Sequence, residues 1–176
     1  MPIPTESKAS SAAPVRYGPD RFDPVAMVLA WVLPGLGHWY LGEKRRAMLI
    51  GAGILGLFCG GVLIGGVNAV DSKEDTIWFV GQAIVGPVAL GVDAAHQNLL
   101  KVKMKDPGTG KETVRSAWPH ETRGPDGWPA TAQAGQRPPS STSLGRMNEL
   151  GTLFSTIAGM LNLLVIVDAA MHGRRQ

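Results

Sequence analysis

Two Asp and His pairs are the first feature of the sequence that could do chemistry. Asp93 and His96 are three residues apart, and Asp168 and His172 are four apart. On a helix, both spacings place the carboxylate and the imidazole on one face. Each pair lies near the end of an uncharged stretch, and Asn162 lies inside the second stretch. Polar groups in such stretches are functional candidates by default, so a proton relay or a metal site is one interpretation.

A structural role is the stronger interpretation of the same residues. Asp93 and Asp168 fall within the last two turns of their apolar segments, where a hydrogen bond to a neighbouring helix or snorkelling satisfies a carboxylate. The predicted topology puts the two pairs on opposite membrane sides, so they cannot form one metal centre. The sequence also contains no Ser/His/Asp triad, H-E-x-x-H helix or dinucleotide motif. We therefore predict no cofactor, no metal and no enzymatic activity.

A further polar residue, His38, follows a break in the first apolar segment, residues 25–41. Pro34, Gly35 and Gly37 interrupt this segment about ten residues in, roughly 15 Å along a helix. That depth is about half a bilayer, so both a kinked span and a re-entrant hairpin are open. His38 could bind a ligand or donate to the carbonyls that the break frees. The second role is favoured because broken backbone in lipid needs donors.

These residues lie in a chain whose composition indicates a membrane protein. Of 176 residues, 44% are hydrophobic and only 18% are charged, and uncharged runs are long enough to cross a bilayer. The single cysteine, Cys59, excludes an internal disulfide. The net charge of +3 comes from basic residues beside the apolar runs, which indicates topology and no nucleic-acid partner. We expect a multi-pass protein of the bacterial inner (plasma) membrane, with the lipid bilayer as its solvent.

The predicted fold is an all-α membrane bundle of three full spans plus the broken first segment. Residues 1–22 are expected to be a flexible tail, residues 23–100 three membrane segments, residues 101–141 a flexible cytoplasmic loop, residues 142–173 the fourth segment and residues 174–176 a short tail. Asp23 before Pro24 is a helix start signal. Lys and Arg divide 14 to 3 between the two sides if the first segment is re-entrant, against 11 to 6 if it crosses. The positive-inside rule favours the re-entrant form, and both forms place the C-terminus outside.

Small residues recur at helical spacing along the apolar segments and predict close helix packing. The stripes run through the second, third and fourth segments, and their glycines are Gly56, Gly60, Gly61, Gly65, Gly91, Gly151 and Gly159. Such faces let neighbouring backbones approach. We expect them to pack within the bundle and against a membrane-protein partner or a second copy of the chain.

The break itself carries a resemblance. The run Pro34-Gly35-Leu-Gly37-His38-Trp-Tyr40-Leu-Gly42 resembles the Pro-Gly-Leu-Gly-His-x-Tyr-x-Gly signature of small, uncharacterised bacterial multi-pass membrane proteins. These are distantly similar to the two-transmembrane-helix domain, and the aliphatic run that ends at Asp168 resembles the close of that domain's second helix. The resemblance implies the membrane class and names no catalytic residue.

Three functional hypotheses follow. The first is a non-enzymatic scaffold or accessory subunit, because packing faces are abundant and no polar site converges. The second is a small transporter or channel-like protein that uses Asp93, His96, Asn162 and Asp168. The third is a membrane anchor whose cytoplasmic loop binds a protein partner.

Overall fold

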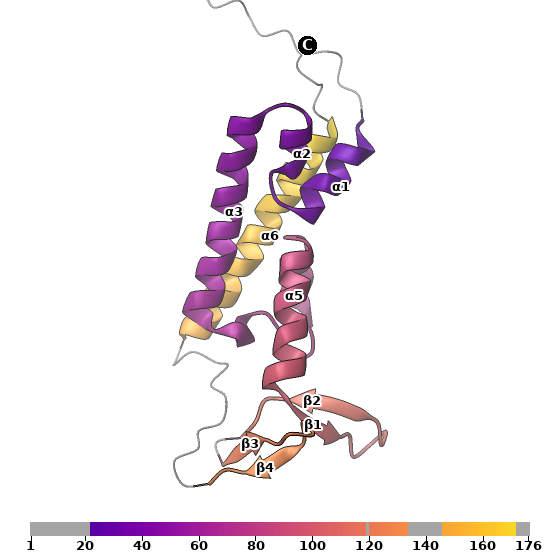
Figure 1. The fold of residues 1–176 in the computed structure, drawn as a ribbon, viewed down its shortest axis with the longest axis vertical. Coiled ribbons are helices and arrows are strands. Elements are labelled where there is room, and N and C mark those ends of the chain that lie inside the picture. The colour runs from indigo at the N-terminus through magenta and orange to yellow at the C-terminus, as the bar shows by residue number, and fades with distance from the viewer. Residues whose placement is uncertain (1–21, 119, 134–145, 172–176) are drawn as a thin grey trace, which may run out of the picture.

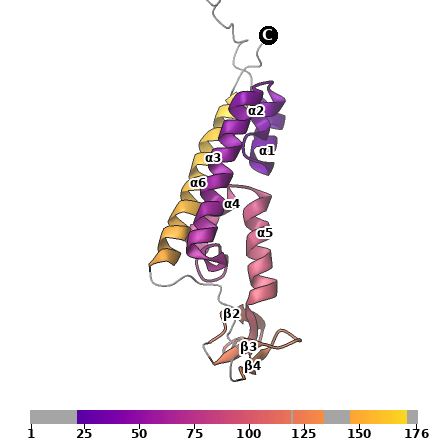
Figure 2. The same ribbon diagram turned by 60° about the vertical axis from the view of Figure 1, so that its left-hand side comes forward.

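The computed structural model describes residues 22–118, 120–133 and 146–171, and these are mostly helical. Two long helices form its frame: α3 (Lys44–Gly65) and α6 (Met147–Met171) lie side by side in both ribbon views (Figures 1 and 2). They run antiparallel, since the end of α3 contacts Gly151 near the start of α6. Within the described part of the chain, only these two helices are long and apolar enough to cross a membrane. The prediction of three full spans is therefore wrong.

The backbones of α3 and α6 approach closely because the residues at their contact are glycines, which have no side chain. A Cβ on Gly61 would lie 2.8 Å from the Gly151 carbonyl oxygen, and one on Gly65 would lie 2.8 Å from the Gly151 Cα. Atoms at that distance overlap, so only glycine lets the two backbones meet here.

The first apolar segment is a short helical hairpin. It consists of α1 (Pro24–Val32) and α2 (Leu36–Tyr40). As the sequence predicts, Pro24 begins α1 and Asp23 caps it, accepting from the amides of Val25 and Ala26 at 3.1 Å each. Gly35 makes the turn with a φ of 89°, a conformation that glycine adopts at little cost.

Both ends of this hairpin reach the same end of α6. The Asp23 amide donates to the Ala170 carbonyl at 2.8 Å, and His38 contacts Asp168. The chain therefore returns to the end it started from. Of the two shapes left open by the sequence, the geometry is that of a hairpin and not of a continuous kinked helix.

The third apolar segment is a second hairpin, where a full span was expected. After the short η1 (Val67–Ala69), α4 (Thr76–Ala83) runs to a break, and α5 (Pro87–Ala95) returns and continues as the π-helical turn η2 (His96–Leu100). Gly86 has a φ of 110°, and Pro87 starts α5 without an amide donor. The Ser72 amide donates to Asp93 at 2.9 Å, so the two ends of the segment lie together.

The region expected to be a flexible loop contains two β-hairpins, at the end of the molecule where η2 finishes (Figure 1). Strand β1 (Val102–Lys105) pairs antiparallel with β2 (Glu112–Arg115), and β3 (Glu121–Arg123) pairs antiparallel with β4 (Pro129–Thr131). The turns fall at Asp-Pro-Gly and Gly-Pro-Asp-Gly sequences, whose turn chemistry the sequence does signal. The prediction of a wholly flexible loop is wrong because these turns pair short, mixed-polarity strands.

The two helical hairpins, α1–α2 and α4–η2, also change the predicted side of the membrane on which each loop lies. Because the segment between α4 and η2 returns, the acidic loop before α4 and the β-hairpins lie at one end of α6. Asp23 and Ala170 lie at the other end. The charge division used to orient the chain assumed that residues 76–100 cross, so it no longer places the long loop in the cytoplasm.

The core is thin. One buried cluster joins both long helices to the second hairpin through Ile54, Phe58, Val70, Val85, Ala89 and Ala158. A smaller one joins α1 to α6 through Ala26, Ala30, Leu41 and Ala169. Large apolar side chains are exposed on the outside of the long helices, among them Leu63 (85% exposed) and Leu164 (66%). This distribution is unlike that of a water-soluble helix pair, in which the apolar face is turned inward.

Candidate functional site

Polar side chains gather at three levels along α6: at its C-terminal end, near its middle and beside its N-terminal end. The first level is the Asp168 cluster, which we define as His38, Glu43, Arg46 and Asp168. His38 Nε2 and Asp168 Oδ2 are 2.7 Å apart, and Arg46 donates to the same oxygen at 2.7 Å. Arg46 also pairs with Glu43 at 3.3 Å. His38 is fully buried, so the residue after the break is tied to the end of α6.

The second level is Asn162, where the tips of the two hairpins meet. Its Nδ2 donates to the Ile84 carbonyl at 2.8 Å and, more weakly, to the Ala30 carbonyl at 3.4 Å. Both carbonyls belong to residues just before a break, where the helical hydrogen-bond pattern stops. The fully buried Asn162 therefore supplies a donor that each broken helix needs.

The third level is the Asp71 cluster, which we define as Asp71, Glu74, Asp93, His96, Gln97 and Lys101. Lys101 Nζ lies 2.5 Å from Asp71 Oδ2 and 3.0 Å from Glu74 Oε1. Gln97 donates to Asp71 at 2.8 Å and to Asp93 at 3.1 Å. Asp71 and Lys101 are fully buried or nearly so. This ion pair joins the chain just before α4 to the chain just after η2 and so closes the second hairpin.

The charge state of Asp71 follows from its partners. Burial raises the pKa of its carboxyl, but Lys101, the amides of Lys73 and Glu74 and the side chain of Gln97 together outweigh burial and hold the pKa below its ordinary value. Asp71 is therefore a carboxylate at neutral pH and complements the buried ammonium.

The Asp and His residues singled out by the sequence have other partners than expected. His96 faces Asp71, with Nδ1 3.8 Å from Asp71 Oδ2, which is beyond hydrogen-bond distance. Asp93 accepts from the Ser72 amide and from Gln97. Asp168 pairs with His38 and Arg46, and His172 lies outside the described residues. The structure thus brings Asp168 to His38, and Asp93 and His96 into one cluster, but it keeps Asp93 and Asp168 at opposite ends of α6.

The motif residues of the first hairpin divide between its turn and its packing. Pro34 and Gly35 form the turn against α3, and Gly37 faces α1, where a Cβ would lie 2.9 Å from that of Ala30. Gly42 has a φ of 92° in the turn into α3, and Tyr40 is 41% exposed. These residues shape the backbone around His38.

The glycines of the predicted packing stripes fall into two groups. Gly61, Gly65 and Gly151 lie between α3 and α6, and Gly159 lies against the backbone of Gly81 in α4. In contrast, a Cβ on Gly56, Gly60 or Gly91 would meet no described atom within 4 Å. Gly56 and Gly60 therefore leave a smooth, open surface on α3, and Gly91 leaves an open position on α5.

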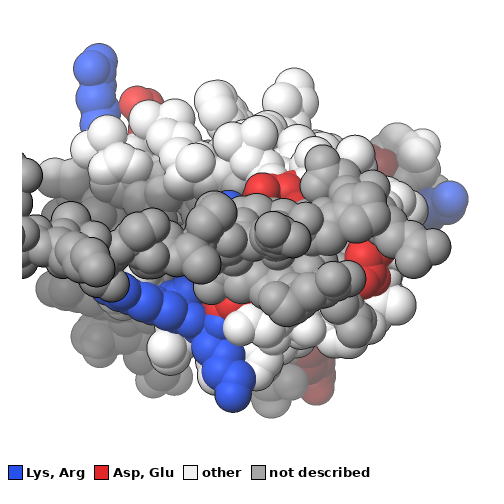
Figure 3. All heavy atoms as spheres, turned by 90° about the horizontal axis from the view of Figure 1, so that it is seen from above, with Lys and Arg blue, Asp and Glu red and all other residues white. Residues whose placement is uncertain are grey.

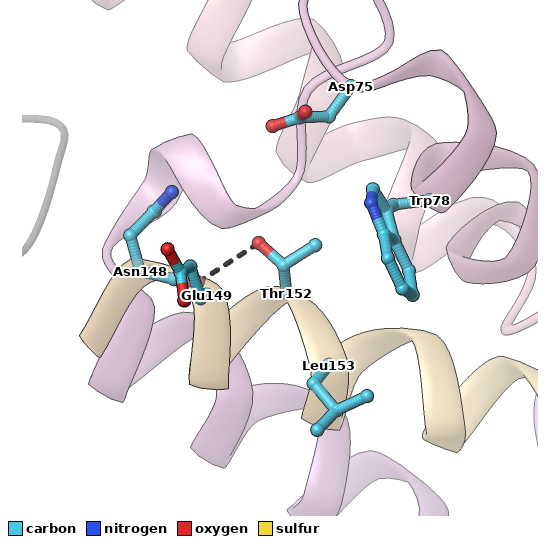
Figure 4. Close-up of a pocket in the computed structure, with 6 residues that line it drawn as sticks. All are labelled: Asp75, Trp78, Asn148, Glu149, Thr152 and Leu153. Carbon is cyan, nitrogen blue, oxygen red and sulfur yellow. Dashed lines mark hydrogen bonds between the residues drawn. The ribbon is translucent and has the colours of Figure 1, made fainter. Parts of the chain in front are cut away.

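A pocket of about 360 Å³ opens beside the N-terminal end of α6. Its walls are the starts of α4 and α6, with Asp75 and Trp78 on one side and Asn148, Glu149, Thr152 and Leu153 on the other (Figure 4). Thr152 Oγ1 is directed back to its own helix, where it donates to the Asn148 carbonyl at 3.0 Å. The lining offers two carboxylates and an indole but no cation.

Several residues that hold the site were not singled out by the sequence. Gln82 is fully buried and donates to the Ala69 carbonyl at 2.7 Å and to Ser155 Oγ at 2.9 Å. An uncharged amide inside an apolar run was its only signal. Asp71 and Lys101 carried a clearer one, since opposite charges border the third segment at its two ends.

Chemically, most of the carboxylates and amides at the three levels already have partners. Both ring nitrogens of His96 and the amide oxygens of Gln97 and Asn162 are buried without a hydrogen bond among the described residues. Among the residues that the structure describes, no group of three or more His, Cys, Asp or Glu side chains has a geometry that could hold a metal ion. The hydrogen bonds and ion pairs named above connect one hairpin to the other, or a hairpin to a long helix. Their common effect is to fix the two helical hairpins against the pair of long helices, α3 and α6.

Residues 25–175 match the family of unknown function DUF6677, and the chain belongs to this family. The matched range covers both helical hairpins, the two β-hairpins and both long helices. No curated protein and no solved structure matches the chain.

Proposed function

We propose that this chain is a multi-pass membrane protein that acts as a non-enzymatic scaffold or accessory subunit. Two features support the membrane location. α3 has 22 residues, about 33 Å at 1.5 Å per residue, which matches a hydrocarbon core of about 30 Å. The 9 residues of α1 and the 8 of α4 each give about half that length. Two half-depth hairpins entering from opposite sides would therefore fill one membrane thickness beside the long helices.

Cysteine labelling tests this arrangement. In a Cys59→Ser background, Phe22→Cys, Lys73→Cys and Lys111→Cys place single thiols at exposed positions. In vesicles of one orientation, we expect an impermeant maleimide to label Lys73→Cys and Lys111→Cys from one side and Phe22→Cys from the other. Labelling of the first two from opposite sides would mean that residues 76–100 cross the bilayer, which would overturn the two-hairpin arrangement.

The scaffold role rests on one observation: most polar side chains bond to other parts of the fold, while an outer surface stays open. We call this surface the open glycine face and define it as Ala52, Gly53, Gly56 and Gly60 of α3. Its residues are spaced by one, three and four positions and so share one side of the helix. Without side chains to keep a neighbour away, this side suits close contact with another membrane helix, here a second copy of the chain.

The native cysteine gives a direct test of self-association. Cys59 is exposed and lies beside Gly60. We expect mild oxidation in membranes to give a disulfide-linked dimer, and Gly56→Ile to reduce it. Gly91→Ile is the matched control, because neither new side chain meets a described atom within 4 Å. A chain that stays monomeric in membranes and co-purifies with no other membrane protein would defeat the scaffold proposal, whereas a co-purifying protein lost only in Gly56→Ile would identify a hetero-oligomer.

A small transporter is the second candidate function, and one observation favours it. Asn162 Oδ1 and Gln82 Oε1 are buried without a hydrogen-bond partner among the described residues. Transporters use broken helices and unpaired polar groups near mid-membrane to bind substrates or ions. If Asn162→Ala abolishes ion or proton flux in liposomes while the dimer persists, this reading replaces the scaffold.

The resemblance to small bacterial multi-pass proteins and to the two-transmembrane-helix domain stays a prediction, as does the bacterial inner membrane. The contact between His38 and Asp168 supports it, since it joins the two motifs that carry the resemblance.

A further inference from the structure

We infer that the first turn of α3 binds the headgroup of an anionic phospholipid. Three successive basic residues, Lys44, Arg45 and Arg46, begin this helix. Asp168 and Glu43 neutralise Arg46, at 2.7 and 3.3 Å. Lys44 and Arg45, in contrast, form no ion pair with any residue that the structure describes. Two positive charges therefore remain for a ligand.

The surface next to these charges has two chemically different parts. A cavity of about 620 Å³ is bordered by the chain from Gly42 to Arg46 and, one turn further along α3, by Leu49 and Ile50. Leu49 is 67% exposed, so an apolar wall continues directly from the basic rim. In the view onto this end of the molecule, Lys and Arg side chains project outward from the surface (Figure 3). An anionic headgroup with an acyl chain presents the same two parts in the same order.

The position of the cavity along α3 fits the level of lipid headgroups. This step depends on the membrane location proposed above. Trp39 and Tyr40 are 45% and 41% exposed just before the turn, and aromatic residues of this kind mark the membrane interface. Lys44 Nζ lies 5.9 Å from the Trp39 ring centroid, which keeps the ammonium at that level.

The exposed cations Lys73 and Arg146 lie at the opposite end of the long helices, but no run of adjacent basic residues in the described part of the chain borders the pocket there. Lys101 there is neutralised by Asp71 and Glu74, and the nearby pocket is lined by the carboxylates Asp75 and Glu149. Lys105 and Lys111 are exposed but belong to the β1–β2 hairpin, away from the apolar helix surfaces. The inference is therefore specific for one end of the molecule.

Native mass spectrometry of the full-length protein with added phosphatidylglycerol or phosphatidylcholine tests the inference. Each cation near an anionic lipid surface contributes enough for about a 5-fold change in affinity, so Lys44→Gln/Arg45→Gln is expected to weaken phosphatidylglycerol binding about 30-fold. Lys105→Gln/Lys111→Gln removes the same charge elsewhere and should leave binding unchanged. Arg45→Lys keeps the charge and should retain most of the affinity.

Other outcomes would overturn the inference. Equal binding of phosphatidylcholine, or equal loss in the two double variants, would mean that no specific headgroup site exists. If millimolar inorganic phosphate displaced the lipid completely, the site would be one for a soluble anion. These results are separate from the membrane proposal, because the cysteine labelling pattern can hold while lipid selectivity fails.

Discussion

The Asp71–Lys101 ion pair gives the sharpest test of how the second hairpin is held. Residues 71 and 101 lie on either side of the hairpin, and their charged atoms are 2.5 Å apart with almost no exposure to solvent. We predict that Lys101→Met and Asp71→Asn each destabilise the protein markedly. The physical reason is that each substitution leaves the other charge buried without its main partner.

The expected size of the effect follows from the remaining contacts. Breaking a buried ion pair by removing one partner costs about 3 to 5 kcal/mol. After Lys101→Met, Asp71 still accepts from two amides and from Gln97, so we expect about 3 kcal/mol. After Asp71→Asn, Lys101 keeps only the half-exposed Glu74 as an anionic partner, and the loss should be at least as large. The double variant should cost clearly less than the sum, since it leaves neither charge behind.

Unfolding by SDS in mixed micelles, followed by circular dichroism, measures these differences. The reasoning would be refuted if both single variants lost less than about 1 kcal/mol, the range of a solvent-screened surface pair. A strictly additive double variant would be equally damaging, because it would mean that the two groups do not interact.

The same pair fixes the sign of the pH dependence. The folded-state pKa of Asp71 lies below its unfolded value, so its stabilising effect is fully present above the unfolded pKa. The effect is lost as the pH falls through the lower, folded-state pKa. In Lys101→Met the ammonium no longer holds the folded-state pKa of Asp71 down, so the gap between its folded and unfolded pKa values narrows. This variant should start from a lower stability at neutral pH but lose less further stability on acidification than the wild type. A loss of stability between neutral and acid pH that is as large in this variant as in the wild type would contradict the assignment.

Three further predictions concern the other contacts. Asn162→Ala should lower the stability by about 1 to 2 kcal/mol in the same SDS titration, because the partly buried Ile84 carbonyl loses its donor; an unchanged midpoint would mean that other contacts hold the tips of the two helical hairpins together. Gly159→Leu should prevent folding or cost more than about 3 kcal/mol, since its Cβ would overlap the Gly81 backbone, whereas Gly91→Leu should change stability by less than about 1 kcal/mol. Arg115→Ala should raise the pKa of Glu121 from about 2 toward its ordinary 4.5, measured by NMR titration, because Arg115 is its largest stabilising partner; a titration still near pH 2 would exclude this pair as the cause.

Local signals in the sequence predict the helices that depend on local chemistry. Asp23 followed by Pro24 marks the start of α1, and the Pro34-Gly35 break appears where the sequence puts it. The long uncharged runs predict α3 and α6, with ends that differ by a few residues. These features need only capping, backbone conformation and apolar length, which a single segment contains.

The second hairpin could not be predicted in the same way. Pro87 recurs with Ala83, Gly91 and Ala95 at every fourth position, and this spacing is typical of a packing face on one continuous helix. The break is made by Gly86, immediately before Pro87, which has a positive φ. In a continuous uncharged run, the sequence alone does not signal this backbone conformation. Asp71 and Lys101 are 30 residues apart in the sequence, so their pairing depends on a fold that no local pattern encodes.

The two halves of the chain solve one physical problem in the same way. A helix broken inside an apolar environment leaves carbonyls without donors, and the break must also be kept from opening. In each half, a basic residue pairs with a carboxylate at the open end of the hairpin: Arg46 with Asp168, and Lys101 with Asp71. The two tips then share one donor, Asn162. That amide lies on α6, the helix that also carries Asp168. A change at any of these levels should therefore destabilise both helical hairpins, and we expect the chain to unfold as one unit.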